Sequence, residues 1–254
     1  MIDFFDILKS KNEPMYYCGW LCLVAAIGCF ILTKTTKTQV SGVNAWFKPF
    51  KFLLSTTIFV WSMGWYLQYL DPTPSLKWYA WGMILLLNFE NVYIIFQASR
   101  GELSHFNLST PFKATMFSLM GFAAASISFW TAFIGLQFFS DKVAHLPDSY
   151  LWGIRLGILI FFFFSLQGFA MGARLSHTVG GADGSEGLPV VNWSKKYGDL
   201  RISHFLGMHA LQVIPLLSFY VLTSTLSVVI AAIIYALITT AIFIQALKGK
   251  PLLR

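Results

Sequence analysis

Seven long apolar stretches constrain this chain more than any other feature of its sequence. Each holds about 20 mostly apolar residues, the length needed to cross the hydrocarbon of a bilayer. They cover residues 15–33, 51–70, 77–98, 114–139, 150–174, 202–222 and 224–246. Backbone polar groups in lipid must be paired within their own segment, so each stretch is predicted to be a transmembrane helix.

The composition supports the same conclusion. Charged residues make up 11% of the chain and apolar residues 56%, whereas a soluble domain carries about 25% charge. Despite a net charge of +7, this excludes an ordinary soluble globule, a disordered chain and a nucleic-acid-binding module. We expect an all-α membrane protein, a bundle of seven transmembrane helices, forming a single integral-membrane domain over residues 1–254.

The basic residues predict the orientation of this bundle. Of the 18 Lys and Arg residues, all but five fall on one side of the predicted membrane. The five on the other side are Lys9, Lys11, Lys77, Lys142 and Arg155. Cytoplasmic connections carry the excess of positive charge, so the N-terminus is predicted outside and the C-terminus in the cytoplasm, in a plasma (inner) membrane. An even number of spans would break this separation.

Two segments outside the spans have a distinct character. Residues 1–14 carry Asp3 and Asp6 where a signal peptide would be positive, so we expect a retained interfacial segment lying on the membrane surface. Residues 175–201 form a Gly-rich cytoplasmic loop. Its glycines match no phosphate-binding spacing, and its apolar residues leave two alternatives open, a flexible linker or an ordered functional loop.

Polar residues inside the spans are the candidates for function. Glu90 is the only acid within a predicted span, and Asn91, Tyr93 and Gln97 continue a polar stripe toward the cytoplasm. A structural hydrogen-bond network between helices is one explanation. An intramembrane acid is by default a functional group, and we favour that interpretation for Glu90. The GxxxG pairs Gly153/Gly157 and Gly168/Gly172 indicate close helix packing.

Four of the five histidines lie on the predicted cytoplasmic side. We expect them to line one centre at the inner ends of the third, fifth and sixth spans, together with Glu90. The predicted lining residues are Glu90, His105, Arg174, His177, Asp199, Arg201, His204 and His209.

A redox cofactor, most plausibly b-type haem, is the leading hypothesis for this centre. Neutral imidazoles serve as axial ligands, and His177 and His204 are predicted at similar depth, where both could bind the metal. His105 or His209 would form a second cofactor site, and Arg174 and Arg201 would neutralise propionates. The protein would then have an oxidoreductase role.

Two further functions stay open, and the sequence leaves undecided whether the protein is an enzyme. One is a proton-coupled transporter or channel gated at Glu90. The other is an intramembrane enzyme that modifies a lipid or isoprenoid, with Glu90 and Asp199 as acid/base groups. Expected partners are the lipid bilayer, haem or a small lipophilic ligand, and a second copy or another membrane protein, but no nucleic acid.

Overall fold

The chain is a multi-pass integral membrane protein, as its helices show. A computed structural model describes residues 4–140, 143–185 and 187–253. Within them, six helical segments are long and apolar enough to cross a membrane. They are α2 (Glu13–Thr35), α4 (Pro74–Ser99), α5 (Pro111–Gln137), the segment Asp148–Arg174, α8 (Leu200–Tyr220) and α9 (Thr225–Leu247).

All seven predicted stretches are helical over most of their length, but one is more polar than the rest. The predicted span 51–70 corresponds to α3 (Phe47–Leu67), which is not among the six. Lys48, Lys51, Thr56 and Thr57 lie within α3, and its hydropathy falls short of that of the six segments. Six helical segments of the described residues are therefore long and apolar enough to cross a membrane. The seventh crossing and the orientation of the termini stay predictions.

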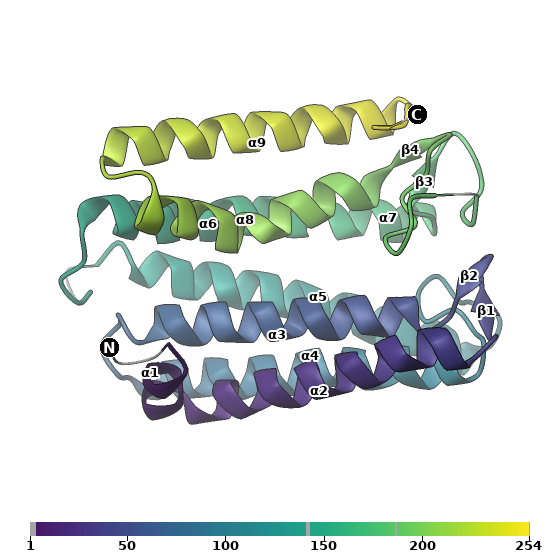
Figure 1. The fold of residues 1–254 in the computed structure, drawn as a ribbon, viewed down its shortest axis with the longest axis horizontal. Helices are drawn as coiled ribbons and strands as arrows, with labels where there is room; N and C mark the ends of the chain where they lie inside the picture. Colours follow the sequence, from purple (N-terminus) through teal and green to yellow (C-terminus); the bar gives the residue numbers. More distant parts are fainter. Residues whose placement is uncertain (1–3, 141–142, 186, 254) are drawn as a thin grey trace. The chain divides into compact units, whose positions relative to one another are not determined.

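The chain divides into two compact units, Met1–Ile127 (unit 1) and Ser128–Arg254 (unit 2), with the boundary inside α5. Unit 1 holds α1 (Phe4–Lys11), α2, a two-residue hairpin, α3, α4 and the first part of α5 (Figure 1). The hairpin pairs β1 (Gln39–Val40) with β2 (Val43–Asn44) in antiparallel fashion.

Polar contacts fix the packing of α2, α3 and α4 in unit 1. The Trp61 indole donates to the Tyr16 carbonyl over 3.2 Å, so the end of α3 lies beside the start of α2 and the two helices are antiparallel. Asn91 of α4 donates to the Thr56 hydroxyl of α3 over 3.0 Å. Because each of these bonds joins buried or half-buried groups, it fixes which faces of the helices meet.

Most of the N-terminal segment forms a short helix, α1. Leu8 is buried, and the Phe4 ring stacks on Trp65 with centroids 4.8 Å apart. Phe5 meets Trp61 edge-on at 5.0 Å. α1 therefore covers the aromatic ends of α2 and α3, and its position at a membrane surface stays a prediction.

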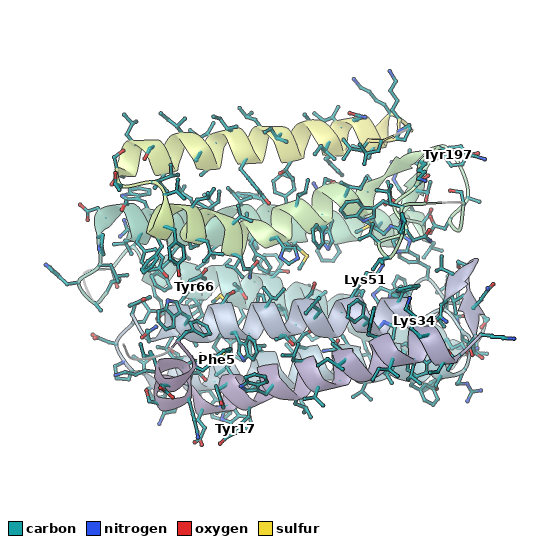
Figure 2. All side chains as sticks on the ribbon, in the orientation of Figure 1. Phe5, Tyr17, Lys34, Lys51, Tyr66 and Tyr197 are labelled. Atoms are coloured by element: carbon teal, nitrogen blue, oxygen red, sulfur yellow. The ribbon has the colours of Figure 1, made fainter. Side chains whose placement is uncertain are left out.

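Basic and aromatic side chains mark opposite ends of unit 1. Lys34 and Lys51 lie at one end, whereas Tyr66 lies at the other, on the side of α1 (Figure 2). Tyr17 of α2 projects outward and is about half exposed. An apolar, exposed flank between two distinct ends is the surface expected of a helix bundle in lipid.

Unit 2 is built on the contact of α6 (Asp148–Ser165) with α8. α7 (Gln167–Arg174) follows α6 directly after Leu166, whose backbone is right-handed helical, so the predicted span 150–174 lies within the single membrane-length segment Asp148–Arg174. Gly153 lies against Ser218, and Gly157 lies against the Ala210 carbonyl and the Pro215 ring. Neither position has room for a methyl group, which explains the first GxxxG pair. α9 packs on α6 and α8, and β3 (Thr178–Val179) pairs with β4 (Gly198–Asp199).

Candidate functional site

The polar stripe of α4 separates into residues with structural partners and residues without. Asn91 is bonded to Thr56, and the Gln97 amide donates to the Leu103 carbonyl over 2.9 Å, which fastens the chain that follows α4. Both side chains are buried. These two members of the stripe therefore belong to the helix-packing network, the structural alternative for this stripe.

Glu90 and Tyr93 differ from these neighbours. Within the described part of the chain, the Glu90 Oε1 atom and the Tyr93 hydroxyl are buried and have no hydrogen-bond partner. A buried polar atom without a partner costs about 1–3 kcal/mol, and more if it is charged. Such orphans are rare in folded proteins and indicate a place where a further group belongs.

Lys48 and His105 lie beside this part of α4. The Lys48 ammonium donates to Nδ1 of His105 over 3.1 Å, and the Ser104 hydroxyl lies 3.2 Å from the same nitrogen. An ammonium has no lone pair, so Nδ1 is the acceptor and the ring carries its proton on Nε2. The Lys48 charge also acts on Glu90. The start of α3, the middle of α4 and the loop after α4 thus share one electrostatic cluster.

Aromatic rings surround the cluster. The His105 imidazole contacts Phe52, Phe106 and Phe117, with ring centroids 5.7, 6.2 and 6.3 Å away. Phe52 also packs on the apolar cluster that contains Tyr93. The aromatic surround lowers the local dielectric, so the charge of Lys48 is screened less here than it would be in water.

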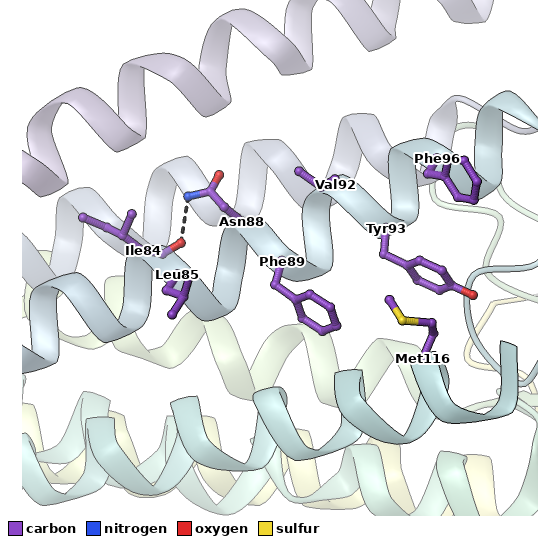
Figure 3. A pocket seen from close by; sticks show the side chains of 8 residues that line it. All are labelled: Ile84, Leu85, Asn88, Phe89, Val92, Tyr93, Phe96 and Met116. Carbon is purple, nitrogen blue, oxygen red and sulfur yellow. Dashed lines mark hydrogen bonds between the residues drawn. The ribbon is translucent and has the colours of Figure 1, made fainter. Parts of the chain in front are cut away.

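An apolar pocket of about 510 Å³ adjoins the cluster. Residues of α4 form one side and Met116 of α5 contributes to the other (Figure 3). The lining residues are Ile84, Leu85, Asn88, Phe89, Val92, Tyr93, Phe96 and Met116. The Asn88 amide donates to the Ile84 carbonyl over 2.8 Å. Tyr93 both lines the pocket and belongs to the apolar cluster on which Phe52 packs, so it links the pocket to the surroundings of His105.

The loop after α4 is fixed by a second set of charges. Glu102 pairs with Lys113 at 2.7 Å and lies 3.9 Å from the Arg100 guanidinium. The hydrogen bond from Lys113 and the nearby positive charges hold the pKa of Glu102 below its ordinary value. The segment that presents His105 is therefore tied at the ends of α4 and α5.

In unit 2, the Gly-rich loop has an ordered hydrogen-bonded structure. Asp183 accepts from the backbone N–H groups of His177 and Thr178, at 3.0 and 2.9 Å, and from the Ser176 hydroxyl at 2.9 Å. Its carboxylate also lies 3.0 Å from Nδ1 of His177. Burial alone would raise the pKa of Asp183, but these hydrogen bonds outweigh it and hold the pKa well below the usual range.

Asp199 and Arg201 fasten the other end of this loop. The buried Asp199 carboxylate receives two bonds from the Arg201 guanidinium, at 2.9 and 2.6 Å, and one from the Ser194 N–H at 2.9 Å. Arg201 also donates to the Asn192 carbonyl. These contacts give both residues a structural role. The predicted catalytic role of Asp199 and the predicted cofactor role of Arg201 are tested by none of them.

The other predicted residues of unit 2 have separate surroundings. Nδ1 of His204 lies 2.9 Å from the Phe164 carbonyl, and His177 lies near enough to interact with it electrostatically. His209 bonds to the Gln212 side chain over 3.2 Å and packs on Phe205. Arg174 is exposed at the end of α7. Of the residues predicted to line one centre, Glu90 and His105 belong to unit 1 and the others to unit 2. That all of them line one pocket stays a prediction.

The sequence selected Glu90 and His105 as candidates, and their roles stay predictions, but it did not predict the pocket between α4 and α5. The pocket-lining residues of α4 are apolar in a span that is apolar throughout, so they carry no distinguishing signal. Among the residues described, no group of three or more His, Cys, Asp or Glu side chains could hold a metal ion. Comparisons with protein families, curated proteins and solved structures give no match.

Proposed function

We propose that this membrane protein binds a small lipophilic ligand in unit 1. The polar head of the ligand would lie at Glu90, Tyr93, Lys48 and His105, and its apolar tail in the pocket between α4 and α5. The observation that carries the proposal is the pair of buried, unpartnered oxygens of Glu90 and Tyr93 beside an apolar pocket.

The energetics favour a ligand over a purely structural role. Two orphan polar atoms within one turn of a helix lower the stability of the fold unless a ligand supplies their hydrogen bonds. A lipid-exposed pocket selects for apolar tails, and a few convergent polar groups at its end select the head. In such a site Glu90 is the group that can exchange a proton with the ligand, so it serves both an acid/base and a proton-transfer role.

The seventh span and the orientation form part of the same proposal. α2 and α4 are both apolar enough to cross the membrane, and α3 joins the end of α2 to the start of α4. The antiparallel contacts of α3 with α2 support a crossing by α3 between those of α2 and α4. In that crossing the polar residues of α3 face helices rather than lipid. Seven crossings would put the two termini on opposite sides. The excess of basic residues on one side would then put the N-terminus outside and the basic ends, with the head site, in the cytoplasmic leaflet of a plasma (inner) membrane.

Co-purification tests the lipophilic-ligand proposal. Val92→Trp and Met116→Trp fill the pocket, whereas Leu237→Trp changes an exposed position of α9 and serves as the matched control. Mass spectrometry of extracts should detect one lipophilic species enriched over bulk lipid in the wild type and the control, and its loss in both pocket variants. Equal extracts from all four proteins would contradict the proposal.

Haem b bound by His177 and His204 is the second candidate, and a specific observation favours it. In each residue Nδ1 is bonded to an oxygen atom, of Asp183 or of the Phe164 carbonyl. This is how proteins orient metal-binding imidazoles, whose Nε2 then faces the metal. Purified protein titrated with haem should give a Soret band that His204→Leu removes and His145→Leu keeps. An unchanged haem spectrum would exclude this candidate.

A further inference from the structure

We infer that the ligand of unit 1 is a quinone: a neutral, flat head with two carbonyl oxygens on an isoprenoid tail. This inference rests on the proposed function and narrows it to one chemical class. The starting point is the kind of polar atom that the site offers to a ligand head.

Hydrogen-bond donors predominate in the cluster. The Tyr93 hydroxyl is unpartnered within the described residues and can donate, and the Glu90 carboxyl group is a second donor when it is protonated. The Lys48 ammonium adds positive potential. A carbonyl oxygen is an acceptor only, so it complements this set, and the positive potential strengthens the bonds it accepts.

The buried carboxyl group of Glu90 selects against an anionic head. A phosphate or carboxylate placed in the cluster would bring a second negative charge into a weakly screened site. A neutral head avoids that repulsion. It also offers Glu90, when protonated, an oxygen acceptor for its otherwise unpartnered carboxyl group.

The aromatic surround and the pocket fit the other two parts of a quinone. Phe52 and Phe117 contact the His105 ring at 5.7 and 6.3 Å and supply apolar faces against which a flat ring can stack. The pocket begins at Tyr93 and continues along Phe89 and Leu85 of α4. Its lining of branched and aromatic side chains suits a methyl-branched hydrocarbon chain.

Equilibrium binding to the full chain in nanodiscs tests the inference, with empty nanodiscs as background. The probe is a radiolabelled benzoquinone with a decyl tail, displaced by unlabelled quinone, decanol or decyl phosphate. We expect saturable binding that unlabelled quinone displaces at least about tenfold more effectively than either competitor, a difference of one hydrogen bond or more.

Each result of this experiment decides a different point. Stronger displacement by decyl phosphate than by quinone would overturn the quinone inference and leave the lipophilic-ligand proposal standing. Absence of saturable binding, with no displacement by any of the three, would count against both.

Variants add an independent test of the head site. Tyr93→Phe removes one hydroxyl from an apolar surround and should weaken quinone binding about tenfold without changing displacement by decanol. Lys48→Met should weaken it similarly, and Lys113→Met, at the Glu102 ion pair, should not. Wild-type affinity for the quinone in Tyr93→Phe and Lys48→Met would refute the assignment, provided that thermal unfolding shows both variants folded.

Discussion

Two carboxyl groups of this chain, those of Asp183 and Glu90, differ in how completely they are hydrogen-bonded. Asp183 is surrounded by donors from Ser176, His177 and Thr178, and its pKa is depressed accordingly. Glu90 has one oxygen buried without a partner within the described chain. Asp183 therefore stabilises the loop that contains it, whereas Glu90 is a cost to the fold that a ligand could offset.

Asp183→Asn is expected to destabilise the protein by about 1 kcal/mol near neutral pH, a modest value because the carboxylate is partly in solvent. A depressed folded-state pKa contributes stability above the unfolded-state value, about 3.9, and that contribution is lost as the pH falls. Thermal unfolding in detergent should show a difference from the wild type at pH 7 that shrinks below about pH 4. Asp71→Asn, in an exposed turn, is the control, and a difference independent of pH would argue against the loop's electrostatic role.

Glu90→Leu is expected to raise the free energy of unfolding by about 1 kcal/mol, because it removes an orphan polar atom from an apolar site. The same variant should lose the co-purifying ligand. Asn91→Leu is the matched control. It removes the amide that donates a hydrogen bond to the buried Thr56 hydroxyl and should lower the free energy of unfolding by about 1–2 kcal/mol. Thermal unfolding of both variants measures this, and a destabilised Glu90→Leu would show that Glu90 is structural.

At the scale of the elements, the sequence predicts helices better than it predicts what they contact. Span length and apolar content are local properties, so every predicted stretch is found as a helix. The contact of α6 with α8 and the bond from Trp61 of α3 to Tyr16 of α2 depend on packing partners, which hydropathy does not report. For the same reason Glu90 could be selected as unusual, but neither its nearness to Lys48 nor the pocket that adjoins Tyr93 could be derived.

The two GxxxG pairs give a prediction at this scale. Gly153→Ala would place a methyl group against Ser218 in the α6–α8 contact and should cost about 1–3 kcal/mol. Gly172→Ala has open space and replaces a poor helix former, so it should be neutral or slightly stabilising. Thermal unfolding of the two variants compares them directly. Equal effects would mean that the close α6–α8 contact does not limit stability.

At the scale of the whole molecule, topology is the property that the apolar pattern constrains most. α9 exposes Leu226, Ile233 and Leu237 along its length, a surface that only lipid or another apolar partner can cover. The basic residues at one end of unit 1 agree with a cytoplasmic location for that end. Whether α3 crosses the membrane decides whether the chain has an odd or an even number of crossings, and so whether its termini lie on opposite sides.

Cysteine accessibility tests whether α3 crosses the membrane. In a background with Cys18, Cys22 and Cys29 changed to Ala, we expect Gln39→Cys to react from the cytoplasmic side and Pro72→Cys from the outside, because α3 lies between them. Ala182→Cys, in the Gly-rich loop, should react from the cytoplasmic side. Membrane-impermeant maleimide on intact cells and on inverted vesicles distinguishes the two faces. Labelling of positions 39 and 72 from the same side would rule out a crossing by α3.

Photo-crosslinking measures the central claim, ligand binding in unit 1, most directly. The probe is a benzoquinone with a diazirine at the end of its decyl tail, and peptide mapping locates the adducts. Our account predicts adducts on α4 and at Met116 that excess unlabelled quinone suppresses, and weaker, unsuppressed labelling of α9. Labelling spread evenly over the exposed faces of all helices, unaffected by competitor, would contradict it.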